Sequence, residues 1–160
     1  MPNHHTPFHH LSFINGIYHH NHHPFTGLTV THYPNKSIKE QFLIINGKYH
    51  GLYRQWSPNG TLIEQRHYLR GEKVGTHRGW YPDASLKFRY QFNTKGQYHG
   101  PVREWYPNQQ LYKSFNFVHG VEHGRQQLFK SDGNTHIDLI SYHGKRYGHL
   151  GQKMCKGSSL

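Results

Sequence analysis

The chain of 160 residues is long enough for one ordinary domain and too short for a catalytic domain with a separate regulatory domain. Its hydrophobic fraction of 33% excludes a thick aliphatic core, whereas 15% aromatic residues and 17 glycines favour strands and turns, so an all-β fold is predicted. The formal net charge of +11 favours acidic partners, and the single cysteine, Cys155, excludes an intramolecular disulfide and a multi-cysteine zinc site.

The beginning of the chain is rich in histidine rather than in apolar residues. No stretch approaches 18 consecutive apolar residues, and the first twenty residues lack the apolar run of a signal peptide. A transmembrane segment is therefore not expected, and the chain as given is predicted to be cytoplasmic. If a signal peptide had been removed from it, the protein would be exported instead.

Eight of the 18 histidines lie within the first 23 residues, in a pattern that differs from an uninterrupted affinity tag. They are His4, His5, His9, His10, His19, His20, His22 and His23. Neutral imidazole is a ligand for Cu, Ni and Zn, so this cluster is a candidate metal-binding segment. The alternative is a solvated polar segment, and residues 1–10 are predicted to form a histidine-rich tail.

A more specific metal site would form at the terminus itself. Met1 precedes the small residue Pro2, so removal of the initiator methionine is expected to leave Pro2, Asn3 and His4 at the mature end. The terminal amine, two amide nitrogens and the imidazole of the third residue would then provide the square-planar nitrogen geometry that Cu(II) and Ni(II) prefer.

A pair of glycines recurs along the chain from residue 47 onward. The first glycines are 24, 25, 24 and 24 residues apart, and a second glycine follows each of them four residues later. The pairs are Gly47 and Gly51, Gly71 and Gly75, Gly96 and Gly100, Gly120 and Gly124, and Gly144 and Gly148. A fixed period of this length is typical of a repeat array.

Each repeat is predicted to form a β-hairpin. The copy at Gly47 contains the aromatic strand LYRQWS, the turn PNG and the strand TLIEQRHYL, and a G-x-x-x-G connection leads to the next copy. Three further positions keep their register: Trp56, Trp80, Trp105 and Phe129; Leu62, Leu86 and Leu111; and Tyr68, Phe92 and Phe117. Strand alternation predicts that the leucines share a face with the last group. Stacked hairpins would form a single elongated antiparallel sheet.

Weaker copies at both ends are expected to cap the array. Residues 11–19 and the segment from Gly27 continue the pattern, with seven extra residues between them. The predicted units are 11–46, 47–70, 71–95, 96–119, 120–143 and a partial unit 144–151. The repeat domain is thus predicted at 11–151, followed by a C-terminal tail at 152–160. Ala84 and Gln109 depart from the pattern by replacing the turn glycine, and an extra residue precedes Gly96.

The acid and base residues of the copy at Gly47 do not recur in the other copies. Glu64 is replaced by Phe88, Lys113 and Ile137 in the equivalent positions, and His67 is replaced by Gln91, Asn116 and Ile140. The free replacement of these groups favours a structural unit, and an active site confined to one repeat is the alternative. We therefore predict no catalytic residues and no enzyme activity.

Three arginines do recur, each three residues after the second glycine. They are Arg54, Arg78 and Arg103, and the residues two positions beyond them are Trp56, Trp80 and Trp105. In a stacked sheet these six side chains are expected on one face, as a candidate binding surface for phosphate or carboxylate groups. Alternatively, the arginine stems cover the indole rings and leave the charged groups in water.

The combination of G-x-x-x-G, an aromatic residue, a Pro-Asn-Gly turn, a leucine and a closing Tyr-x-x-Gly resembles the MORN-repeat variant of bacterial YwqK-type antitoxin proteins. The resemblance covers about residues 11–151 and is clearest over residues 46–124. It implies a scaffold that binds a protein partner, with antitoxin action as one case, and it implies no catalytic motif.

Three functional hypotheses therefore follow from the sequence. The first is a non-enzymatic repeat scaffold for a protein partner. The second is a Cu-, Ni- or Zn-binding protein that uses the N-terminal histidines. The third is binding to acidic lipid or nucleic acid through the basic, aromatic face.

Overall fold

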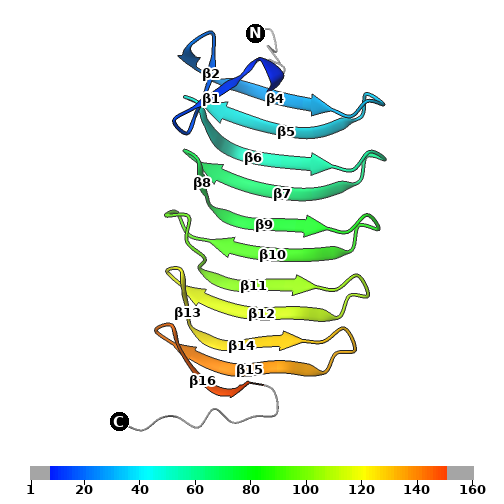
Figure 1. Ribbon diagram of the computed structural model, residues 1–160, viewed down its shortest axis with the longest axis vertical. Coiled ribbons are helices and arrows are strands. Elements are labelled where there is room, and N and C mark those ends of the chain that lie inside the picture. The colour runs from blue at the N-terminus through cyan, green and yellow to red at the C-terminus, as the bar shows by residue number, and fades with distance from the viewer. Residues whose placement is uncertain (1–7, 151–160) are drawn as a thin grey trace.

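The computed structural model describes residues 8–150, which form a short 3₁₀ helix, η1 (Phe8–His10), and two antiparallel sheets (Figure 1). The strands are β1 (Ser12–Ile14), β2 (Ile17–His20), β3 (His23–Pro24), β4 (Gly27–His32), β5 (Ile38–Ile45), β6 (Lys48–Trp56), β7 (Leu62–Leu69), β8 (Glu72–Lys73), β9 (Gly75–Trp80), β10 (Leu86–Phe92), β11 (Gly100–Trp105), β12 (Leu111–Val118), β13 (Val121–Glu122), β14 (Gly124–Phe129), β15 (Thr135–Tyr142) and β16 (Lys145–Leu150).

The main sheet is an open stack of hairpins with β4 at one end and β16 at the other. Its strand order is β16-β15-β14-β12-β11-β10-β9-β7-β6-β5-β4, and the short strands β8 and β13 pair with β7 and β12. Figure 1 shows the hairpins following one another along the long axis, from blue to red. The predicted all-β fold of stacked hairpin repeats is therefore confirmed.

The repeated first glycine lies in the turn that joins one hairpin to the next. At Asn46-Gly47, Arg70-Gly71, His119-Gly120 and His143-Gly144, both residues have positive φ, as a two-residue type I′ turn requires. The connection at Gly96 differs, because its extra residue produces a longer turn in which Gly96 N–H donates to Asn93 O over 3.2 Å. The insertion is thus absorbed locally, and the following strands keep their order.

The opposite edge of the sheet carries the Pro-Asn-Gly turns. The backbone keeps a positive φ at Gly60 (85°), at Ala84 (66°) and at Gln109 (65°), so the residues that replace glycine adopt the same left-handed conformation. Tyrosine hydroxyls link successive turns: Tyr33 Oη donates to Trp56 O over 2.9 Å, and Tyr81 Oη donates to Trp105 O over 2.7 Å. These bonds tie each hairpin to the next at its turn end.

A β-bulge near each of these turns changes the predicted position of the leucines. Leu62 pairs with Trp56 although the preceding pair is Gln55 with Glu64, so one strand contains an additional residue. The same register shift occurs where Leu86 pairs with Trp80 and where Leu111 pairs with Trp105. Directly opposed residues share a face, so the leucines lie with the tryptophans. The prediction that they share a face with Tyr68, Phe92 and Phe117 is wrong because alternation does not continue through a bulge.

One face of the main sheet, here called the aromatic face, carries the buried side chains. Its strand residues include Phe42, Ile44, Phe92, Val102 and Leu139, which are at most 8% exposed. Ring contacts run along it from hairpin to hairpin: Tyr49–Tyr68 at 5.2 Å, Tyr68–His77 at 5.7 Å, His77–Phe92 at 4.7 Å, Phe92–Tyr98 at 4.7 Å and Tyr98–Phe117 at 5.1 Å between centroids. This aromatic packing replaces the aliphatic core that the composition excludes.

The N-terminal end contains an element that the repeat pattern did not predict. Strands β1, β2 and β3 form a separate three-stranded sheet, so the predicted first unit, residues 11–46, is divided between two sheets. Phe8 of η1 packs edge-on against Phe42, with centroids 5.5 Å apart, and against Tyr18 of β2. Together with Phe25 and Ile44 they belong to one buried apolar cluster. The predicted tail at 1–10 therefore contains a packed aromatic residue, Phe8.

Candidate functional site

The face opposite the aromatic face carries a transverse row of polar side chains. Successive cross-strand pairs define it from β5 to β14: Gln41, Arg54, Gln65, Arg78, Arg89, Arg103, Ser114 and Gln127. We call this face the arginine face. Each member of the row is directly opposite the next, so their Cβ atoms are separated by only about 5 Å. The sheet thus aligns residues that are far apart in the sequence.

The centre of the row consists of three arginines on three adjacent strands. Arg89 of β10 pairs with Arg78 of β9 on one side and with Arg103 of β11 on the other. The sequence pattern identified Arg78 and Arg103 but not Arg89, because the positions equivalent to Arg89 hold Gln65, Ser114 and Asp138. Arg89 could have been predicted from the register of its hairpin, because β9 and β10 flank a short turn that places Arg89 opposite Arg78.

One carboxylate continues this row, since Asp138 of β15 is paired with Gln127, and the other carboxylates of the described residues lie outside the row. Ion pairs within 4.0 Å join Glu40 to Lys39, Glu64 to Arg66, Glu104 to Lys113, Asp138 to Arg125 and Glu122 to Arg146. Glu40, Glu64 and Glu104 belong to the aromatic face. Within residues 8–150, no carboxylate forms an ion pair with Arg54, Arg78, Arg89 or Arg103. The arginines of the row are therefore a concentration of positive charge that no carboxylate of the described residues neutralises through an ion pair.

Arg103 is held more firmly than its neighbours. Its guanidinium donates to Val102 O over 3.1 Å, to Phe115 O over 2.5 Å and to Asn116 Oδ1 over 3.2 Å. Partial burial, and then the nearby charge of Arg89, lower the pKa of Arg103 from its ordinary value. Both causes disfavour the charged form of Arg103. An anion at this position would be attracted by the positive potential of Arg103 and Arg89, which no ion pair of the described residues neutralises.

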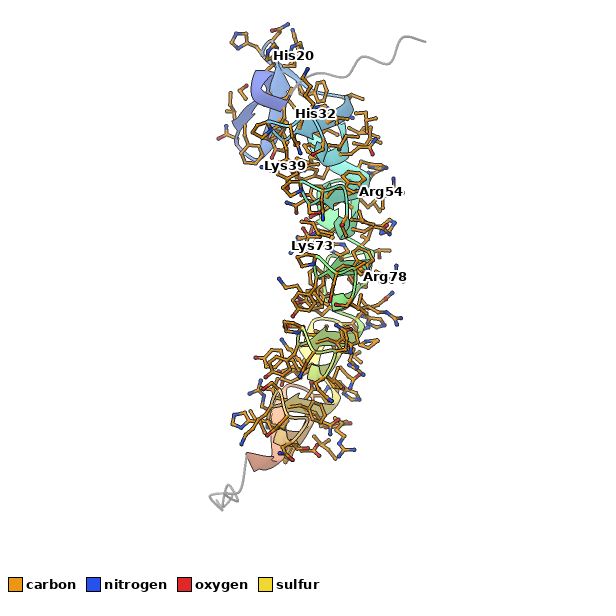
Figure 2. All side chains as sticks on the ribbon, turned by 90° about the vertical axis from the view of Figure 1, so that its right-hand side faces the viewer. His20, His32, Lys39, Arg54, Lys73 and Arg78 are labelled. Atoms are coloured by element: carbon orange, nitrogen blue, oxygen red, sulfur yellow. The ribbon has the colours of Figure 1, made fainter. Side chains whose placement is uncertain are left out.

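The three tryptophans lie beside the row, two residues beyond the recurring arginines. Trp56, Trp80 and Trp105 are half-buried and each is opposite a leucine across the bulge. They form an apolar band between the arginines and the turn edge. Figure 2 shows Arg54 and Arg78 on one side of the sheet and Lys73 on the other.

The N-terminal histidines are distributed over several elements. His4 and His5 lie outside the described residues, as does the proposed Pro2-Asn3-His4 site, and the side chain of His9 is likewise not described. His10 belongs to η1, His19 and His20 to β2, His22 to the following turn and His23 to β3. Among the residues that the structure describes, no three His, Cys, Asp or Glu side chains are grouped to hold a metal ion.

Two of these histidines are nevertheless direct neighbours. His20 pairs with His23 across the turn formed by Asn21 and His22, both of which have positive φ. His19 is engaged instead with its own strand, since its Nδ1 lies 3.0 Å from Ile17 O. The small sheet therefore presents one two-histidine pair, which is exposed at His23.

Another set of histidines lies at the connection edge. His99 and His123 precede the second glycine of their repeats, as His50 does, and each contacts a histidine of the following connection. The ring centroids of His99 and His119 are 4.9 Å apart, and those of His123 and His143 are 6.0 Å apart. His119, His123 and His143 border a groove of about 360 Å³ with Val118, Val121 and Glu122.

Two buried polar residues of the aromatic face were missed by the sequence analysis. His77 Nε2 lies 2.9 Å from His67 O and 3.2 Å from His67 N, and burial is the main cause that lowers the pKa of His77 to about 4. Gln126 satisfies the equivalent groups in its repeat: its Nε2 donates to Asn116 O over 2.9 Å, and its Oε1 accepts from Asn116 N over 3.1 Å. Each side chain therefore contacts the backbone N–H and C=O of one residue on the preceding long strand, His67 for His77 and Asn116 for Gln126.

No protein-family model matches the chain, and no curated protein is significantly similar to it. Residues 8–150 also contain no helix that could span a bilayer.

Proposed function

We propose that this chain is a non-enzymatic repeat scaffold of the MORN-variant type that binds a protein partner through its arginine face. The observation that carries the proposal is the difference in composition and burial between the two faces. The buried residues of the main sheet belong to the aromatic face, whereas the arginine face presents unpaired cations next to an apolar tryptophan band.

The composition of this face matches what protein interfaces use. Tryptophan and arginine are enriched among residues that dominate binding energy, because they combine a large apolar area with directional hydrogen bonding. The face also extends over many strands, which allows one partner to contact several repeats at once. Antitoxin-like capture of a toxin protein is one case of this function, as the resemblance to YwqK-type proteins implies.

The test is affinity capture by the full chain, compared between a face variant and a control variant. Arg54→Glu combined with Trp80→Ala should abolish capture of a defined partner, because both the charge and the apolar band are altered. Lys95→Glu, in an exposed turn at the connection edge, should retain it. Capture should also persist in the presence of a chelator. Equal loss with both variants would refute the assignment of the binding face.

Metal binding by the N-terminal histidines is a second candidate, favoured by the cross-strand pair of His20 and His23. Two imidazoles on adjacent strands can provide two of the ligands of a Cu, Ni or Zn ion. Calorimetry of the tag-free chain with each metal should show binding that is lost in His20→Ala/His23→Ala and retained in His136→Ala. A loss on His4→Ala alone would instead assign the metal to the amino-terminal site.

A further inference from the structure

We propose that Arg78, Arg89 and Arg103 form a carboxylate-binding site that holds an extended acidic segment of the protein partner. The inference rests on the proposed function and deepens it, because it names the chemistry of the partner and the strands that receive it. Its geometric basis is that three guanidinium groups occupy directly paired positions on β9, β10 and β11.

This arrangement is unfavourable for the sheet alone. Like charges directly opposite one another on antiparallel strands destabilise the pair, and Arg89 has such a neighbour on both sides. The flanking members of the row, Gln65 and Ser114, are neutral, so the excess charge is confined to three strands. An anion bound between the arginines would offset this repulsion, because each guanidinium group would attract it. Anion binding therefore accounts for a row of arginines that side-chain packing does not explain.

The carboxylates that could neutralise the three arginines from within the chain are paired with other cations. Glu64 and Glu104 are on the opposite face with Arg66 and Lys113, and Asp138 is bound to Arg125. Among residues 8–150, no side-chain hydrogen bond or ion pair involves Arg78 or Arg89. Their guanidinium groups are therefore available for bidentate contacts with carboxylates from outside.

The dimensions fit a peptide segment. Three adjacent strands span about 10 Å, at roughly 4.8 Å per step. In an extended peptide, alternate side chains are separated by about 6.8 Å, so two or three acidic residues on one side of the segment would reach all three arginines. Arg103 is already oriented by its bonds to Val102 O, Phe115 O and Asn116 Oδ1, which reduces the ordering that binding would require.

The surroundings favour a protein over a nucleic acid strand. Stacking of bases requires open aromatic faces, whereas Trp80 and Trp105 are half-buried and packed opposite Leu86 and Leu111. They offer an apolar band that suits the apolar side chains of a peptide with acidic residues on alternate positions. A membrane surface would be expected to engage cations along the whole face, but the contiguous charge ends at Gln65 and Ser114.

The experiment uses the full chain and a fluorescein-labelled dodecapeptide of alternating glutamate and valine, with binding followed by fluorescence anisotropy. Arg89→Gln should weaken binding at least tenfold, since it removes the central charged hydrogen bonds. Arg89→Lys should have an intermediate effect, because it keeps the positive charge and loses the planar guanidinium that makes bidentate hydrogen bonds. Arg70→Gln, at an exposed turn of the connection edge, is the matched control and should bind as the unmodified chain does.

A second measurement is independent of any ligand. Arg89→Gln should raise the midpoint of thermal unfolding of the unliganded chain at low salt, and the gain should shrink as salt screens the arginines. A merely structural arginine would lower that midpoint instead.

The inference would be overturned by unchanged peptide affinity in Arg89→Gln. It would also be overturned if oligothymidylate or phosphatidylserine vesicles bound more tightly than the peptide with the same dependence on Arg89, since the row would then serve phosphate groups. If Arg89→Gln retained the partner while Arg54→Glu/Trp80→Ala lost it, the proposed function would stand and this site would fail.

Discussion

The two faces of the main sheet use the same strands for different purposes. On the aromatic face, Phe42 is 1% exposed and Val102 is 2% exposed, and rings contact one another along the array. On the arginine face, Arg89 is exposed and its nearest cross-strand neighbours carry the same charge. Because alternate residues of each strand point to opposite faces, one sequence period determines both surfaces at once.

The difference between the faces indicates where stability and binding reside. A single-layer sheet has no second layer to cover it, so burial must come from contacts between side chains of neighbouring strands. Those contacts are concentrated on the aromatic face, which leaves the arginine face free to carry groups that do not stabilise the fold. Substitutions on the two faces should therefore differ strongly in their effect on unfolding.

The largest difference is expected between Phe42 and its chain neighbour Gln41. Phe42→Ala removes a ring that contacts Phe8, Tyr49 and Tyr53, and should lower the free energy of unfolding by about 3–5 kcal/mol. Gln41→Ala, on the arginine face, should change it by less than about 0.5 kcal/mol. Urea unfolding monitored by circular dichroism measures both. Similar losses for the two variants would contradict the division between the faces.

The aromatic face should also be sensitive to pH at His77. Its pKa is lowered to about 4 in the folded chain, so the unfolded chain binds the proton first as the pH falls. The stability contribution of neutral His77 is therefore complete above about pH 6.5 and is lost between that pH and about pH 4, by about 3 kcal/mol.

The matched variant is His77→Gln, because Gln126 already makes the equivalent backbone bonds in another repeat. It should remain folded and should lose stability less steeply than the unmodified chain between pH 6.5 and 4, as urea titrations at several pH values would reveal. An identical pH dependence in both proteins would show that His77 is not the titrating group.

The close packing of the aromatic face can be tested at Gly79. A Cβ atom at this position would lie 2.1 Å from Phe88 Cε1, so Gly79→Ala must displace a ring that stacks on Tyr90 with centroids 4.6 Å apart. We expect a loss of about 1–3 kcal/mol in the free energy of unfolding. In a Phe88→Ala background the same substitution should have little effect. A double-mutant cycle that shows no coupling would rule out this contact as the cause.

The turn edge belongs to neither face, and substitutions there should change the free energy of unfolding by an intermediate amount. Ala84 has a φ of 66°, so Ala84→Gly should relieve a left-handed alanine and stabilise the chain by up to about 1 kcal/mol. Gly60 has a φ of 85° and open space around it, and Gly60→Ala should produce a loss of similar size. Thermal unfolding of both variants checks the pair, and two changes of the same sign would disprove the explanation.

The smallest effect is expected at Arg54. Its neighbours in the transverse row are Gln41 and Gln65, so Arg54→Gln relieves no repulsion and should alter the free energy of unfolding by less than about 0.5 kcal/mol at any salt concentration. The contrast with Arg89→Gln, measured by thermal unfolding in low and high salt, separates an isolated arginine from a contiguous row. A salt-dependent gain in both variants would show that the whole face, rather than its centre, is under repulsion.

Several elements of the fold were predictable from local chemistry. The spacing of Gly47, Gly71 and their equivalents predicted the connections, because a two-residue turn with positive φ favours glycine. The recurrence of Arg54, Arg78 and Arg103 predicted a shared face. The three-stranded sheet of β1, β2 and β3 was not predictable in this way, because its residues lack the repeat period and its position depends on Phe8 and Tyr18 packing against Phe42.

The candidate site was predictable only in part. Arg89 was not predicted because no other repeat has an arginine at the equivalent position. His77 and Gln126 were not predicted because they differ in residue type, although they contact equivalent backbone groups. The leucines at positions 62, 86 and 111 were assigned to the wrong face because a bulge cannot be read from alternation.

The sequence by itself determined the all-β class, the period and the hairpin unit, since these follow from backbone preferences of glycine, aromatic and turn residues within one repeat. The tertiary structure alone decided which side chains become neighbours across strands. That choice depends on hairpin register and bulges, and it brings Arg78, Arg89 and Arg103 together from three strands. A shift of one residue in any of these pairings would place Arg89 against a different neighbour, and the row would not exist.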